Sequence, residues 1–137
     1  MNLELGGGID LLSIDIDGND YYVWDKIYSI DPRVVVIEYN AKFPANFEWI
    51  MNYDESHIWK YDDEMGASLK SLELLGNAKG YQLVGTNVTG SNAFFVKKEL
   101  ARDLFPLPAI SENLWNPARY GMKYISGHRA GKYVGKI

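Results

Sequence analysis

The chain has 137 residues, of which 47% are hydrophobic and 23% charged, the composition of an ordinary folded domain. A chain of this length forms one domain that buries about two-thirds of its unfolded surface. The formal net charge of −4 argues against a nucleic-acid partner, because phosphate binding requires a basic surface. The absence of cysteine excludes disulfides, thiolate catalysis and cysteine–zinc sites, and fits a cytoplasmic protein. No apolar run approaches the roughly 20 residues of a membrane helix, so no membrane partner is expected.

The first elements along the chain are a strand, a helix and a second strand. Residues 11–16 (LLSIDI) predict a strand, because this short apolar run meets an Asp-Gly turn at once. Residues 19–30 predict a helix that Asn19 or Asp20 can cap. Residues 32–41 are the clearest strand, and four successive apolar residues in it indicate cover on both faces, as in a parallel sheet.

The second part of the chain is predicted to form a long loop, a helix and a hairpin. Residues 42–65 have no sustained hydrophobic period and are expected to form an aromatic and acidic loop with one short helix at most. Residues 66–81 carry a leucine stripe and predict a helix that Gly80 ends. Residues 81–86 and 93–98 predict two antiparallel strands around a turn. Residues 1–98 therefore form the predicted α/β domain, and the proline-containing residues 99–137 an irregular C-terminal arm.

Three aspartates stand where the first strand ends, at the edge where open α/β sheets keep their ligand sites. An EF-hand loop counted from Asp15 would need glycine at its sixth position and glutamate at its twelfth, where this chain has Asp20 and Lys26. Asp17 and Asp20 also suit a turn or a helix cap. Asp15 lies between two isoleucines, and a carboxylate in such a place needs partners.

The segment IDIDGND resembles the first motif of the haloacid-dehalogenase superfamily. That resemblance implies a phosphatase in which Asp15 attacks phosphorus, Asp17 is the general acid and magnesium screens the charge. Asn19 stands where that family has threonine, and the next strand ends in IEYN instead of a phosphate-binding serine or threonine.

A longer resemblance covers four segments, which follow one another as in the C-terminal half of FkbM-like methyltransferases dependent on S-adenosylmethionine (SAM). The segments are IDLLSIDIDGNDYYVWDKI, PRVVVIEYNAKF, GASLKSLELLGNAKGYQLVGTN and SNAFFVKK. The resemblance implies a partial Rossmann-like methyltransferase sheet with parallel strands, a C-terminal antiparallel hairpin and helices packed on the sheet. Its last strand would be inserted, antiparallel, beside its neighbour.

The methyltransferase resemblance also implies a reaction, methyl transfer from SAM to an acceptor hydroxyl. Asp15 or Asp17 would orient or deprotonate the acceptor, and Glu38 and Asn40 would position it. Aromatic residues of the long loop either line the acceptor pocket or pack on the sheet, and Trp49 is taken as substrate-binding; the others are Tyr53, Trp59 and Tyr61.

IDIDGND is similar, too, to the strand end of metal-dependent O-methyltransferases, whose first acid binds a divalent ion. Asp15, Glu38 and Asn40 all offer oxygen ligands, so together they are the predicted metal site.

The glycine-rich turn between a strand and a helix that grips the methyl donor in this fold is not found in the sequence, since Gly6–Gly8 precede the first strand. We therefore expect that the N-terminal SAM-binding half is lacking and that the chain alone binds SAM weakly or not at all. Residues 11–16 would then form an exposed sheet edge that favours a homo-oligomer. A non-catalytic interaction module is the remaining alternative.

Overall fold

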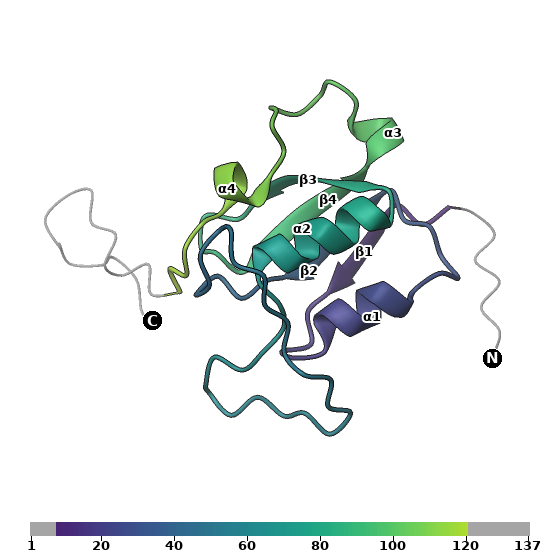
Figure 1. The fold of residues 1–137 in the computed structure, drawn as a ribbon. Helices are drawn as coiled ribbons and strands as arrows, with labels where there is room; N and C mark the ends of the chain where they lie inside the picture. Colours follow the sequence, from purple (N-terminus) through teal and green to yellow (C-terminus); the bar gives the residue numbers. More distant parts are fainter. Residues whose placement is uncertain (1–7, 121–137) are drawn as a thin grey trace, which may run out of the picture.

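The computed structural model describes residues 8–120 (Figure 1); the start of the chain and the end of the predicted arm, residues 121–137, lie outside the described part. The elements in order are β1 (Leu11–Ile14), α1 (Asp20–Lys26), β2 (Val34–Glu38), α2 (Leu69–Ala78), β3 (Tyr81–Thr86), β4 (Asn92–Lys97), α3 (Lys98–Ala101) and α4 (Ser111–Leu114). The predicted strands and the two main helices are all present. Both helices are shorter than the sequence pattern indicated.

The four strands form one mixed sheet in the order β1-β2-β4-β3. β1 and β2 are parallel, with Ile14 opposite Ile37. β4 is antiparallel to both β2 and β3, so β3 runs parallel to the first two strands although a reversed strand separates them. The prediction of parallel strands followed by an antiparallel hairpin is therefore confirmed at the level of a mixed α/β sheet.

The core lies between one face of this sheet and the helices α1 and α2, which Figure 1 shows side by side on that face. Trp24 of α1 is 1% exposed and its ring lies 4.8 Å from the ring of Phe95 on β4. Burial alternates along β2: Val35 and Ile37 are fully buried, whereas Val34 and Val36 are half-buried. The expected cover on both faces is thus not seen for β2, because α1 and α2 pack on the same side.

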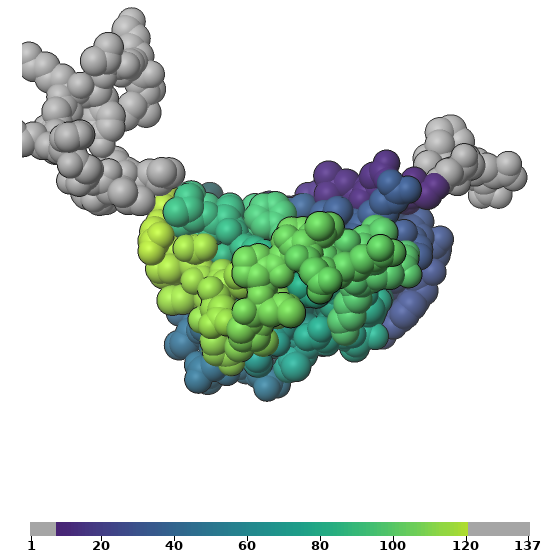
Figure 2. Space-filling view, turned by 90° about the horizontal axis from the view of Figure 1, so that it is seen from above, coloured from purple at the N-terminus to yellow at the C-terminus, as the bar shows by residue number. Residues whose placement is uncertain are grey.

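The two edges of the sheet differ. The β3 edge is covered by the chain that follows β4: α4 contacts β3, and Asn116 Nδ2 donates to Thr86 Oγ1 at 2.9 Å. Figure 2, viewed from the top of Figure 1, shows these residues, green to yellow, spread over that side of the molecule. β1 has no neighbour on its outer side among the described strands, and Leu11 is 57% exposed. Residues 11–16 were expected to form the exposed edge of the sheet, and the position of β1 at that edge confirms this prediction.

The described part of the arm, residues 99–120, is irregular apart from most of α3 and the single turn of α4. The buried carboxylate of Glu73 on α2 accepts from the backbone N–H of Ser111 at 2.6 Å, which fixes the start of α4 against the domain. Residues 42–65 contain no helix, and their one regular contact is an isolated bridge between Ile50 and Ala67. Within residues 8–120, none of the helices has the length and apolar character needed to cross a membrane.

Gly76 marks the closest approach of α2 to the sheet. A Cβ atom built there would lie 2.8 Å from the ring of Phe95 and 3.0 Å from that of Trp24. We expect Gly76→Ala to lower the free energy of unfolding by about 1–3 kcal/mol, because overpacking outweighs the gain in helix propensity of about 1 kcal/mol. Asn77→Ala, on the exposed side of the same helix, is the matched control. Urea unfolding that shows Gly76→Ala as stable as the control would contradict this packing.

Candidate active site

The candidate site forms where β1 and β2 end. Because Ile14 and Ile37 are paired in register and point into the core, the next residues, Asp15 and Glu38, emerge side by side from the other side of the sheet. Carboxyl ends of neighbouring parallel strands meet at one edge, which explains why two acids 23 positions apart in sequence come together.

The turn that follows β1 is held by Asp20 at the start of α1. This buried carboxylate accepts hydrogen bonds from the backbone N–H groups of Ile16 and Gly18, both at 3.0 Å. Between them Asp17 adopts a φ of 53°, a left-handed conformation that few residues other than glycine take. Asp20 is therefore a structural residue of the turn, and its bonds determine the direction of the Asp17 side chain.

His57, from the long loop, lies on the same turn. Its Nε2 is 3.1 Å from the carbonyl oxygen of Asp17, and a Cβ atom on Gly18 would lie 2.5 Å from the ring. A side chain at position 18 would therefore displace the imidazole from the turn. No sequence spacing predicts this contact, since 40 residues separate His57 from Asp17.

Three carboxylates converge at this edge: Asp15, Asp17 and Glu38 each offer an oxygen, and these oxygens lie within 4.8 Å of one another. Oxygens bound to one calcium ion at about 2.3–2.6 Å can be at most about 5 Å apart, and those around smaller hard cations are closer. The spacing and the all-oxygen donor set therefore fit a divalent hard cation.

Glu38 is the least solvated of the three acids. Burial, followed by the negative charges of Asp15, Asp20 and Asp17, raises the pKa of Glu38 to about 8. Its Oε2 atom is buried and has no hydrogen-bond partner among the described residues. Burial and the charges of Asp20 and Asp17 also raise the pKa of Asp15. A bound cation would neutralise the repulsion between the carboxylates, and it would supply a partner for the buried Oε2 of Glu38.

Asn40 was expected to be a metal ligand or a substrate contact. Its amide nitrogen donates to the carbonyl oxygens of Asp63 and Met65 at 2.8 and 3.2 Å, and its oxygen accepts from the backbone N–H of Lys42. Asn40 is thus engaged in fixing the path of the long loop over the site. Asp15, Asp17 and Glu38 form the acidic cluster, and Asn40 lies beside it.

A cavity of about 380 Å³ adjoins the cluster. Its lining comes from the strand ends and from the long loop; the residues used below are Asp17, Glu38, Lys42, Trp59, Tyr61 and Ser91. Trp49, expected to bind substrate, lies elsewhere: its ring stacks on Phe43 at 4.5 Å, and it is not among the cavity residues. The structure instead brings Trp59 and Tyr61, further along the same loop, to the site.

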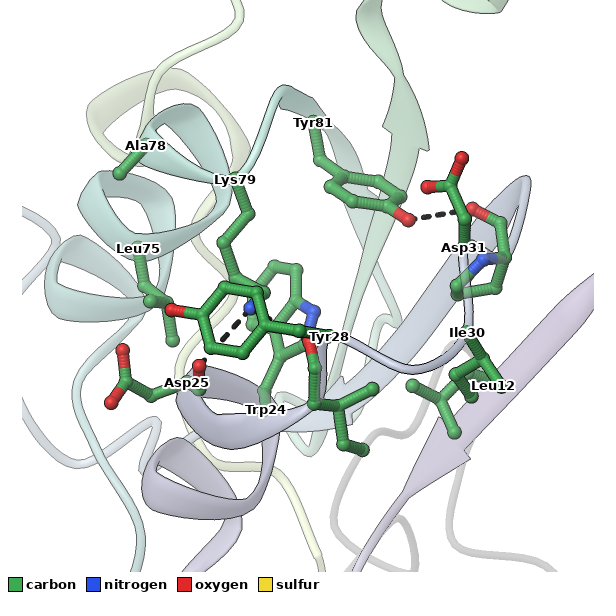
Figure 3. A pocket seen from close by; sticks show the side chains of 12 residues that line it. Leu12, Trp24, Asp25, Tyr28, Ile30, Asp31, Leu75, Ala78, Lys79 and Tyr81 are labelled. Atoms are coloured by element: carbon green, nitrogen blue, oxygen red, sulfur yellow. Dashed lines mark hydrogen bonds between the residues drawn. The ribbon is translucent and has the colours of Figure 1, made fainter.

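A second cavity, of about 290 Å³, lies where α1 and α2 end, near the beginning of β3 (Figure 3). The amine of Lys79 donates to the carbonyl oxygens of Asp25 and Ile27 at 3.2 and 3.1 Å and lies 4.0 Å from the centre of the Tyr28 ring. Burial lowers the pKa of Lys79. These contacts cap the C-terminal end of α1, so the amine of Lys79 stabilises the fold and is not available for a ligand.

Comparison with models of protein families, with curated proteins and with solved structures gives no match for this chain. The geometry of the strand ends and of the adjoining cavity is therefore what supports a function.

Glu38→Gln should alter the pH dependence of stability. Between about pH 4.5 and pH 8 the folded chain keeps a proton on Glu38 that the unfolded chain loses, so this residue makes stability fall as pH rises through that window. Near pH 4.5 the free energy of unfolding of the variant should equal that of the parent chain. Above about pH 8 it should be higher than that of the parent by about 1–3 kcal/mol, a range already reduced for solvent screening.

Chemical unfolding across this pH range, in buffer containing a chelator, measures the difference. Asp10→Asn is the control, since Asp10 is exposed and pairs with Arg33 at the other end of β1. Parallel stability curves for Glu38→Gln and the parent chain would refute the proposed burial of the charge.

Proposed function

We propose that this chain is a methyltransferase-like domain and provides the acceptor side of a cation-assisted O-methyl transfer site. The observation that carries the proposal is the convergence of three carboxylates at the carboxyl ends of the parallel strands β1 and β2. The strand order supports it, because β4 lies antiparallel between two strands of the opposite direction, as the FkbM-like resemblance implies for the last strand.

The cation would be held by Asp15, Asp17 and Glu38. When bound, a divalent cation supplies positive charge that lowers the pKa of a coordinated hydroxyl group. Glu38 must lose its proton to become a ligand, so affinity for the cation should rise with pH. The exposed Asp15 and Asp17 need less rearrangement to bind.

The acceptor would lie in the cavity that Asp17 and Glu38 line. SAM, when bound, supplies an electrophilic methyl group, whose bond to the sulfonium sulfur would break with the electron pair left on a neutral thioether. Asp17 borders both the cluster and the cavity, which suits it to orient the acceptor hydroxyl and to receive its proton as the new oxygen–carbon bond forms. The glycine-rich turn for the donor is not found in the 137 residues, so no residue of this chain is assigned to SAM.

Cation binding is the first test of this proposal. We expect the chain to bind Mn²⁺, detected by paramagnetic relaxation of water protons, and Asp15→Asn to weaken binding at least about tenfold because one anionic ligand becomes neutral. Asp10→Asn changes the same charge at the opposite end of β1 and should have no effect. The second measurement is calorimetric titration with SAM, which the chain alone should bind weakly or not at all because it has no glycine-rich turn between a strand and a helix.

Two outcomes would overturn the proposal. Equal Mn²⁺ affinity in Asp15→Asn and the parent would show that the cluster is not the binding site. Hydrolysis of p-nitrophenyl phosphate with Mg²⁺, abolished by Asp15→Asn, would favour the phosphatase that the Asp-x-Asp-Gly sequence also resembles.

We also propose that the chain self-associates through β1. The arm covers the β3 edge, whereas β1 presents unpaired backbone groups and an exposed Leu11. Light scattering should show a species larger than the monomer, and Leu11→Lys should shift it toward the monomer by placing a charge at the edge. Leu104→Lys, at an exposed leucine of the arm, is the control. A monomer at all accessible concentrations would exclude this interface.

A further inference from the structure

The cavity beside the acidic cluster combines two chemically different linings, which together indicate what it can bind. Glu38 at the end of β2 and Ser91 in the turn before β4 bring polar groups, whereas Trp59 and Tyr61 bring aromatic faces from the long loop. Its volume of about 380 Å³ lies within the usual range of about 300–1,000 Å³ for small-molecule sites.

The aromatic part of the lining is held in place although it is exposed. The indole N–H of Trp59 donates to the carbonyl oxygen of Asp62 at 3.0 Å, which fixes the orientation of the ring. The Tyr61 ring lies 4.7 Å from it at an angle of 43°, and the two residues are 39% and 87% exposed. An oriented and exposed aromatic pair is an accessible stacking surface.

The backbone conformation also indicates that this cavity is a ligand site. Only Asp17, Tyr61 and Arg102 among the non-glycine residues of the described chain have a positive φ, and the first two border this cavity. A bulky residue such as Tyr61 at a φ of 63° costs free energy, and such conformations cluster at ligand-binding segments.

The charges of the cavity disfavour an anionic ligand. The one lysine of the lining, Lys42, is paired with Asp63, and an oxygen of Asp62 accepts from the backbone N–H of Glu64 at 3.0 Å. The buried Oε2 of Glu38 remains without a partner. Within residues 8–120, the lining therefore offers hydrogen-bonding groups and aromatic faces, and no unpaired lysine or arginine for a phosphate or carboxylate.

We infer that the cavity binds a neutral polyhydroxylated ring, a sugar or a cyclic polyol, whose C–H face stacks on Trp59 while its hydroxyls meet Glu38 and Ser91. The C–H bonds of such a ring carry partial positive charge and match the negative face of an indole. Its hydroxyl oxygens are also suitable ligands for a hard cation at the neighbouring carboxylates. The inference rests on the proposed function and names the class of its acceptor.

Saturation-transfer NMR on the full chain with Mg²⁺ tests this inference. The probes are methyl α-glucopyranoside and myo-inositol as polyols, p-cresol as a flat aromatic and choline as an organic cation. We expect the polyols to bind, and Trp59→Ala to weaken them by about three- to tenfold through loss of the stacking surface. Tyr53→Ala removes an exposed aromatic side chain of the same loop outside this cavity and should leave binding unchanged.

Absence of polyol binding overturns the inference, and so does undiminished polyol binding in Trp59→Ala. Preferential binding of choline or p-cresol overturns it in favour of a cationic or an aromatic ligand. Failure of the proposed function is distinguishable. Trp59-dependent polyol binding together with an unchanged Mn²⁺ affinity in Asp15→Asn keeps this site and removes the proposed function. Asp15-dependent Mn²⁺ binding without polyol binding removes this inference and leaves the proposed function.

Discussion

The parallel register of β1 against β2 is the constraint on which the candidate site depends. Pairing Ile14 with Ile37 places both side chains in the core and forces the following acids, Asp15 and Glu38, onto the opposite side of the sheet as neighbours. A slip of one residue would put an acid into the core and an isoleucine at the site. The hydrophobic pattern that stabilises the sheet therefore also fixes the distance between the two carboxylates.

This arrangement has an electrostatic cost that the rest of the domain must offset. Glu38 is partly buried beside other acids, and burial together with their charges raises its pKa to about 8, because its charged form is unfavourable there. The close contact of Gly76 on α2 with Trp24 and Phe95 supplies well-packed apolar area in compensation. A site in which like charges persist against such a cost is typical of a binding function.

The sequence predicted the parts of the site that follow from local patterns, and not those that depend on the path of the long loop. Asp15 and Glu38 could be placed because each ends a recognisable strand, and the direction of parallel strands brings them together. Trp49, Trp59 and His57 lie in a segment without hydrophobic period, so nothing in the sequence distinguished the aromatic residue that stacks on Phe43 from the one that reaches the cavity. That choice is made by long-range contacts.

Asn40 is the clearest of those contacts, and it shows why the two halves of the site are physically separable. Its side chain donates to the carbonyl oxygens of Asp63 and Met65, so a residue just before the loop holds the returning chain near the strand ends. Asp15 and Glu38 are positioned by the sheet and Asp17 by the turn that Asp20 holds, whereas the aromatic pair depends on loop contacts that include this amide and the bond from Trp59 to Asp62. A change in the loop can therefore alter which ligand fits while the acidic cluster stays intact. Under the proposed function, substitutions at Trp59 or Tyr61 would alter the choice of acceptor and leave the three carboxylates in place.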